Sequence, residues 1–92
     1  MVLRDCKIET TKGFVLNNIA ICKINLGLYN DAYNIFKECV REYCLIESLY
    51  NLTIVCYIKK DLRRFLQYTG VLIEKNYDIP EELKQIYFYY LL

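Results

Sequence analysis

The sequence contains no histidine and no tryptophan, and only one serine, one proline and three glycines. Histidine is the most frequent general base and a frequent metal ligand, so its absence removes the side chain that most active sites use. Three scattered glycines make no glycine-rich phosphate loop, and Ser48 does not stand in the Gly-x-Ser-x-Gly turn of a hydrolase nucleophile. We therefore predict that the protein is not an enzyme, and we expect no cofactor.

An excess of charge is also missing. The chain has 12 basic and 11 acidic residues and a net charge of +1. Its one local run of charge, residues 59–64, is of the kind expected at a solvated helix end and turn. Nucleic-acid binding requires a basic excess on one face, and a membrane span requires about 20 consecutive apolar residues. Neither occurs, so we expect no nucleic-acid partner and no membrane span.

The cysteines are odd in number and form no Cys-x-x-Cys pair. The five positions are Cys6, Cys22, Cys39, Cys44 and Cys56. Near the amino end, any apolar signal segment is interrupted by four charged residues, Arg4, Asp5, Lys7 and Glu9. Without paired ligands or histidine we expect no metal site. The prediction is a cytoplasmic protein with reduced thiols that act as small hydrophobic side chains.

Apolar and aromatic residues are abundant. Hydrophobic residues make up 55% of the chain, with ten tyrosines and four phenylalanines, which is above the share of an ordinary soluble domain. A chain of this length forms one small domain, spanning residues 1–92, or a piece of a larger one. Such a composition leaves apolar surface exposed unless another surface covers it.

Apolar residues recur at steps of three and four, which predicts helices. Five are expected, at residues 14–26, 32–40, 49–57, 62–75 and from 78 onward. Gly27 is expected to end the first helix in the left-handed conformation. The expected N-caps are Thr10 or Thr11 for the first helix, Asn30 for the second, and Asp78 or Ile79 for the last. A strand competes with the helix at residues 54–58 and 87–92.

Short connections make consecutive helices antiparallel hairpins, and these hairpins repeat. Placing Asn18 on Asn51 gives an offset of 51 − 18 = 33 residues, close to the ~34 residues of the tetratricopeptide repeat (TPR). The same offset also pairs apolar residues with one another: Ile19 with Leu52, Ile21 with Ile54, Tyr29 with Leu62, and Cys39 with Leu72.

The first unit, residues 14–44, resembles the TPR consensus. The matching residues are Ala20, Gly27, Tyr29, Ala32, Phe36 and Cys39. The second unit, residues 47–76, is a degenerate copy in which Thr53, Lys60 and Phe65 replace small or glycine residues. Residues 79–92 are an extra helix. The resemblance implies an all-α fold, a right-handed superhelical stack of antiparallel helix hairpins, which is a TPR-like α-solenoid of about five helices.

In that family the first helices of the units line a concave surface that binds proteins. The corresponding positions here are Asn17, Ile21, Asn25, Tyr50, Ile54 and Tyr57. Tyrosine and asparagine suit a peptide groove because they offer rigid aromatic area and adaptable hydrogen bonds. The alternative is that Ile21, Ile54 and Tyr57 belong to the core. The lysines of a carboxylate clamp are missing from these positions, so that form of recognition is not expected.

A narrower resemblance rests on three motifs. They are Asn17-Asn18-Ile19, Gly27-Leu28-Tyr29-Asn30-Asp31-Ala32 and Tyr50-Asn51-Leu52-Thr53-Ile54, followed by Cys56-Tyr57, Asp61, Arg63 and Arg64. Over residues 16–73 the chain thereby resembles the polaris family, the TPR subunits of the intraflagellar transport B complex. The resemblance implies a scaffold in cilium assembly with intraflagellar transport subunits as partners. It also implies that the chain is a fragment or a shortened form, since such proteins carry many repeats.

Three interpretations of function follow. The first is a TPR segment of a ciliary transport subunit, and the second is a generic TPR adaptor in another cytosolic assembly. The third is a small helical protein that forms a homodimer through its apolar C-terminal helix. In each of them the protein works by binding other proteins, in the cytoplasm or the cilium.

Overall fold

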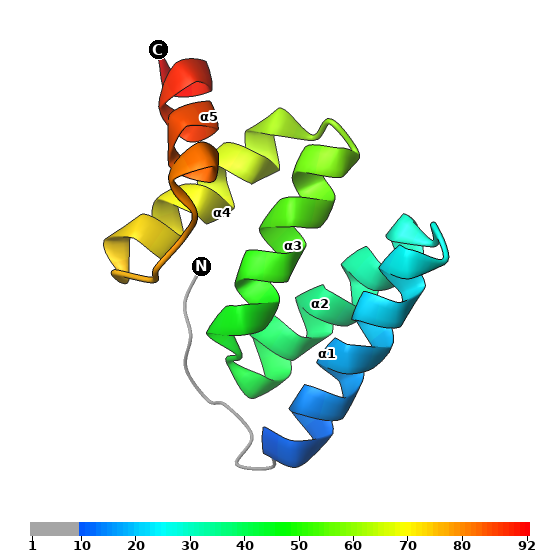
Figure 1. Ribbon diagram of the computed structural model, residues 1–92. Helices are drawn as coiled ribbons and strands as arrows, with labels where there is room; N and C mark the ends of the chain where they lie inside the picture. The colour runs from blue at the N-terminus through cyan, green and yellow to red at the C-terminus, as the bar shows by residue number, and fades with distance from the viewer. Residues whose placement is uncertain (1–9) are drawn as a thin grey trace.

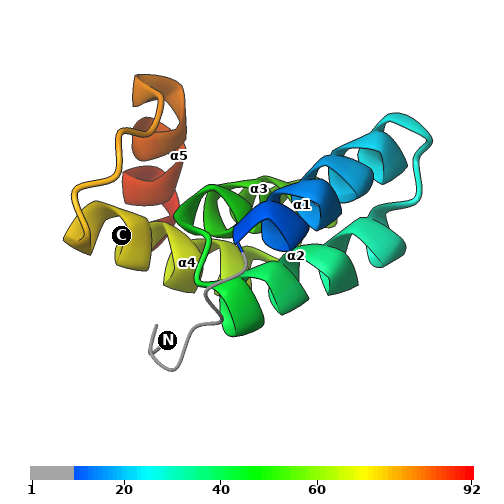
Figure 2. The same cartoon turned by 90° about the horizontal axis from the view of Figure 1, so that it is seen from below.

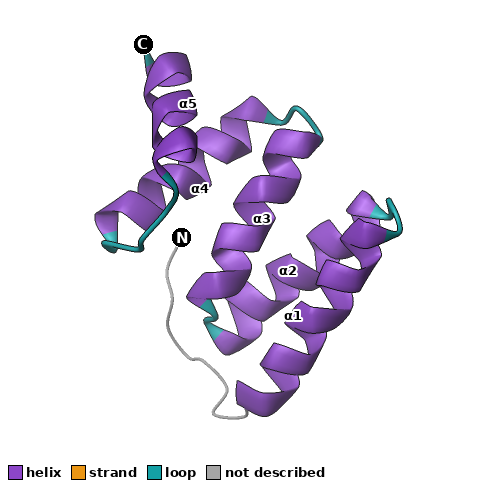
Figure 3. Ribbon diagram, viewed as in Figure 1, coloured by secondary structure: helices purple, strands orange, loops and turns teal. Residues whose placement is uncertain are grey.

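The computed structural model describes residues 10–92, which form five helices (Figure 1). These are α1 (Thr10–Asn25), α2 (Tyr29–Tyr43), α3 (Ile46–Ile58), α4 (Leu62–Glu74) and α5 (Glu81–Leu91). No strand occurs in this part of the chain (Figure 3). The all-α class and the five helices are thus confirmed, including both segments where a strand was the alternative. The predictions for residues 1–9, namely the charged positions and Cys6, lie outside the described residues.

Each helix packs on the next one along the chain. In Figure 2, α1 and α3 lie in one layer above α2 and α4, and α5 rises from α4 on the side of α1 and α3. The odd-numbered helices thus share one side of the molecule, which Figure 1 shows face on.

The core is built from one face of each helix. Its fully buried members include Ala20, Ala32, Phe36, Leu49, Leu52, Val55, Phe65 and Leu72. Ala20 and Ala32 carry only a methyl group, which lets α1 and α2 approach closely. Of the other positions matched to the TPR consensus, Phe36 and Cys39 are fully buried. Tyr29 is half-buried against the core.

The turns that end the helices repeat along the chain. Gly27 follows α1 with φ +77°, and Lys60 follows α3 with φ +61°, at a separation of 60 − 27 = 33 residues. The hydrogen bond that closes the first turn, from Leu28 N to Lys23 O at 2.9 Å, recurs from Asp61 N to Cys56 O at 2.9 Å. This pattern of donor and acceptor is the Schellman motif. α4 ends in the same way, with Asn76 at φ +59° and a hydrogen bond from Tyr77 N to Leu72 O at 2.9 Å, so the motif ends consecutive helices as well as helices 33 residues apart.

Gly27→Ala is expected to lower the free energy of unfolding by about 1–2 kcal/mol, because an L-residue is strained at positive φ. Nothing lies within 4 Å of a Cβ added at Gly27, so the cost comes from the backbone alone. Lys60→Gly, at the equivalent turn, should have the opposite sign and stabilise by up to about 1 kcal/mol. Urea denaturation measures the free energy of unfolding of both variants. Changes of the same sign would contradict the assignment of one positive-φ turn conformation to both sites.

The cap predicted for the second helix is wrong. α2 begins at Tyr29, and Leu28 is its N-cap, with no side-chain hydrogen bond to the helix. The Leu28 carbonyl accepts from Ala32 N at 3.1 Å, which starts the helix one residue before Asn30. The Asn30 side chain instead accepts a hydrogen bond from Lys59 Nζ at 2.6 Å.

The caps predicted for the first and last helices are also wrong. Thr10 and Thr11 both lie inside α1 rather than before it. α5 begins at Glu81 with Pro80 as N-cap, because the extended Pro80 carbonyl accepts from the amides of Leu83 and Lys84. Asp78 and Ile79 therefore precede the cap, and Ile79 is buried in the core instead.

The thiols do not all match the expectation of reduced cysteines. Cys22, Cys39 and Cys56 are free thiols. Cys44 takes part in a disulfide bond, so the expectation is wrong for this residue. Of the free thiols, Cys39 and Cys56 are buried and act as small core side chains, as predicted, whereas Cys22 is exposed on α1.

Candidate functional site

The six residues predicted to form a binding surface belong to α1 and α3, the helices that share one side of the molecule with α5 (Figure 1). They differ in exposure. Ile21 is 38% exposed and Tyr57 is 39% exposed. Asn25 is exposed, Tyr50 and Ile54 are half-buried, and Asn17 is buried. The surface that is accessible to a partner therefore consists mainly of the residues near Tyr57, together with Ile21 and Asn25.

Asn17 lies in a polar cluster between α1 and α3. Its Oδ1 accepts a hydrogen bond from Ser48 Oγ at 2.7 Å and a second from Asn51 Nδ2 at 3.2 Å. Asn17 is 5% exposed and Ser48 is fully buried. The Asn17 side-chain oxygen thus links α1 to α3 by hydrogen bonds. Ile21, one turn later, lies on the same side of α1.

Tyr50 and Ile54 pack partly against the core. The Tyr50 ring lies 5.7 Å from the ring of Tyr77, which belongs to the connection between α4 and α5. Burial raises the pKa of the Tyr77 hydroxyl, with the nearby Glu47 carboxylate adding to the effect. Tyr50 and Ile54 therefore pack against the core, and each of them also remains partly exposed.

Tyr57 lines two adjoining cavities between α3 and α5. One has a volume of about 400 Å³ and is bounded by Tyr57, Ile58, Lys60, Leu62 and Tyr90. The other, of about 360 Å³, is bounded by Tyr57, Glu82, Gln85, Ile86, Tyr89 and Tyr90. Only Tyr57 and Tyr90 belong to both. The Tyr57 ring is held 5.3 Å from the buried ring of Phe65, so its position at the mouth is set by the core.

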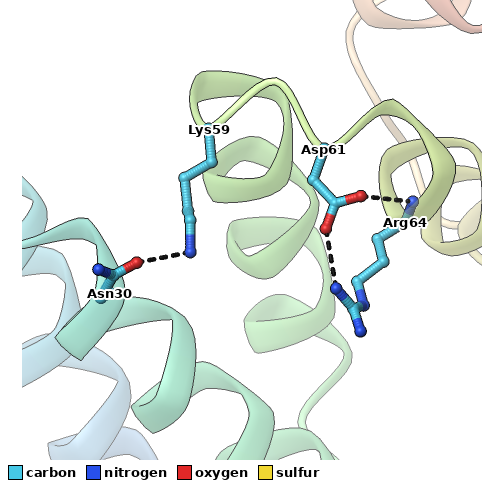
Figure 4. A network of polar contacts seen from close by, with 4 residues as sticks. All are labelled: Asn30, Lys59, Asp61 and Arg64. Atoms are coloured by element: carbon cyan, nitrogen blue, oxygen red, sulfur yellow. Dashed lines mark hydrogen bonds and ion pairs between the residues drawn. The ribbon is translucent and has the colours of Figure 1, made fainter.

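A polar cluster holds the turn between α3 and α4 beside the first cavity (Figure 4). Lys59 Nζ donates to Asn30 Oδ1 at 2.6 Å and lies 4.9 Å from the ring centroid of Tyr33, which ties the end of α3 to α2. The Asp61 side chain caps α4 by accepting from Arg64 N at 3.3 Å and from Arg64 Nη1 at 3.0 Å. The Arg64 hydrogen bond lowers the pKa of the Asp61 carboxyl.

Two of the free thiols, Cys39 and Cys56, are poorly suited to nucleophilic chemistry. Burial raises the pKa of the Cys56 thiol to about 11, and it also raises that of Cys39. Both thiols are therefore protonated at neutral pH, whereas a nucleophilic cysteine requires a thiolate. Within residues 10–92 no group of three or more metal-ligating side chains comes together. None of the helices described here has the length and apolar character to cross a membrane.

Sequence reasoning missed the contribution of α5 to the site. Tyr89 and Tyr90 were identified only as part of an apolar tail, Lys60 as a turn residue and Leu62 as the start of the fourth helix, although all four line the cavities. The dense aromatic run at residues 87–90 was the available signal. Its position beside α3 depends on how α5 packs, which periodicity along the chain does not reveal.

Comparison of the chain with protein-family models, with curated proteins and with solved structures finds no match. The function proposed below therefore rests on the residues and geometry of this chain.

Proposed function

We propose that this protein is a protein-binding scaffold of the TPR type, with α1, α3 and α5 providing the binding face. Support comes from the 33-residue offset, which relates side chains in the sequence and also relates the turns at Gly27 and Lys60. Further support comes from the four fully buried positions matched to the consensus in the first unit, Ala20, Ala32, Phe36 and Cys39. A repeat of hairpins presents one layer of helices to a partner.

The observation that carries the proposal is the pair of cavities that meet at Tyr57 and Tyr90. Their volumes of about 400 and 360 Å³ lie at the small end of ligand pockets, and each suits one or two apolar side chains of a peptide. Tyrosine is enriched among the residues that dominate binding energy in protein interfaces. Partly exposed tyrosines around a small cavity thus fit a protein partner better than a reaction centre.

The polaris-like motifs favour one cellular setting. We propose that the partners are intraflagellar transport B subunits and that the protein acts in cilium assembly, in the cytoplasm or the cilium. A generic adaptor role in another assembly is the alternative, and it uses the same face.

Tyr57→Ala is expected to weaken partner binding about 30-fold, because truncating a central aromatic residue of an interface costs about 2 kcal/mol. The measurement compares capture of intraflagellar transport B subunits from ciliated cells by immobilised wild-type and variant protein. Tyr57→Phe should retain most binding. Val15→Ala, at a position 52% exposed on the other side of α1, is the matched control and should retain all of it.

Two results would count against the proposal in different ways. If wild-type protein captures no transport subunit but retains other proteins through Tyr57, the ciliary assignment is wrong and the adaptor role stands. If Tyr57→Ala binds every captured protein as well as wild type does, while its circular dichroism spectrum is unchanged, the cavities are not the binding site.

A further inference from the structure

The side of α1 that faces away from α3 carries a stripe of exposed apolar residues. We name it the α1 seam, and its members are Val15, Ile19, Cys22 and Leu26. Val15 is 52% exposed, Ile19 42% and Leu26 72%, and Cys22 is an exposed free thiol. Positions separated by steps of four, three and four lie along one face of a helix. Asn17, which bonds α3, lies midway between Val15 and Ile19 in sequence and hence on the opposite side.

The seam has positive charge at both of its ends. Lys12 and Lys23 are the charged residues of α1, which contains no acid. Lys23 makes one long ion pair, 4.0 Å to Asp31. The two lysines are 23 − 12 = 11 residues apart, which is about 16 Å along a helix. A covering helix that carries acidic residues at one end therefore places them near a lysine of α1 in either orientation.

α5 has this pattern of charge and apolar surface. Glu81 and Glu82 stand in its first turn, and the rest of the helix carries no acidic residue. The basic residue of α5, Lys84, lines a cavity with Asn76 and Asp78 on the α4 side.

The exposed apolar residues of α5 that line neither of the Tyr57 cavities form a second surface, which we name the α5 ridge. Its members are Phe88, Leu91 and Leu92, which are 51%, 54% and 105% exposed. They lie three and four residues apart, on one side of the helix.

We propose that copies of this protein associate head to tail, with the α5 ridge of one copy lying along the α1 seam of the next. Two α1 seams paired in either direction bring lysine against lysine. Two α5 helices paired in parallel bring glutamate against glutamate, and paired antiparallel they bring no unlike side-chain charges together at their ends. Only the pairing of α1 with α5 opposes unlike side-chain charges in both directions, so it is favoured over a symmetric dimer through the C-terminal helix.

Because the α1 seam and the α5 ridge are different surfaces, every linear assembly of copies has an unoccupied seam at one end and an unoccupied ridge at the other. Such heterologous association continues beyond the dimer as concentration rises. Seven partly exposed side chains provide on the order of 1,000 Å² of total buried area, which is below the range of standard stable interfaces. The association is therefore weak, and it should be sought up to about 300 µM protein.

Sedimentation of the full chain from about 1 to 300 µM tests the inference. The average mass of wild-type protein is expected to rise steadily with concentration. Ile19→Glu and Phe88→Glu should each weaken self-association at least about tenfold. An equimolar mixture of the two variants should recover association, because one keeps its ridge and the other keeps its seam, and it should stop at a one-to-one dimer.

Matched controls lie on the other sides of the same helices. Phe14→Glu, at a position 43% exposed on α1, and Tyr90→Glu, at a position 44% exposed on α5, should associate as wild type does. Circular dichroism checks that each variant folds, and Leu26→Glu with Leu91→Glu is the substitute pair at more exposed positions. Tyr57→Ala should leave self-association unchanged, which separates this inference from the proposed function.

Three results would overturn the inference. The first is wild-type protein that stays monomeric over the whole range. The second is Ile19→Glu that associates as strongly as wild type does, since the α1 seam would then be no part of the contact. The third is a mixture of the two folded variants that remains monomeric.

Discussion

Phe36→Ala is expected to lower the free energy of unfolding by about 3–5 kcal/mol, the range for truncating a fully buried phenylalanine. Phe36 is 0% exposed and belongs to the main core cluster, together with residues of all five helices. Its removal loses the transfer free energy of the ring and leaves a cavity that the surrounding helices fill only in part. Domains of this size are stable by about 5–15 kcal/mol, so the variant should retain only a fraction of its stability.

Guanidinium denaturation followed by circular dichroism measures this loss. Phe88→Ala is the matched control, because the same substitution at a 51% exposed position should change stability by no more than about 0.5 kcal/mol. Equal effects at the two positions would show that Phe36 is not buried between the hairpins in solution. A small effect at Phe36 with a lower denaturant dependence would point instead to a loosely packed native state.

The helices and their order could be predicted because their signals are local. Apolar residues at steps of three and four mark each buried face, and Gly27 and the polar run at residues 59–61 mark two of the ends. The 33-residue offset predicted two similar hairpins, and the turns at Gly27 and Lys60 share one backbone conformation. That Lys60 adopts positive φ without being glycine follows from the hydrogen bonds of its turn rather than from its residue type.

Helix caps were predicted less well, since they depend on competing partners. Asn30 has the residue type of an N-cap, but its side chain is bonded to Lys59, which is 29 residues away. Asp78 likewise has a suitable type, but the conformation of Pro80 starts α5 two residues later. In both cases a contact or constraint elsewhere in the structure decides which residue begins the helix.

The candidate site was also predicted only in part, because it depends on contacts between residues that are far apart in the sequence. The positions carried over from the TPR consensus predicted which side of α3 faces the proposed binding surface, and Tyr57 lines the two cavities between α3 and α5. The consensus contains no information on Tyr89 and Tyr90, because their place beside Tyr57 depends on the packing of α5 against α4. Gly70 contributes to that packing, since a Cβ at this position would meet the Tyr87 hydroxyl at 3.3 Å.

Asn17 is where the sequence-based and structural roles differ most, and its substitution separates them. Asn17→Ala is expected to lower the free energy of unfolding by about 2–4 kcal/mol, because it leaves the buried Ser48 hydroxyl and the half-buried Asn51 amide without their acceptor. A residue that only faced a partner would change stability by no more than about 0.5 kcal/mol. Denaturation of the single variant already distinguishes these outcomes.

A double-mutant cycle then tests the contact itself. Ser48→Ala alone is expected to cost about 1 kcal/mol, and the variant with both Asn17→Ala and Ser48→Ala should lose less than the sum of the two. The reason is that removing both partners also removes the buried hydroxyl that the first substitution leaves unpaired. A coupling free energy of about 1 kcal/mol or more supports the 2.7 Å bond between α1 and α3. Additive effects would instead show that the two hairpins are not joined at Asn17, and this residue would then be free to contact a partner.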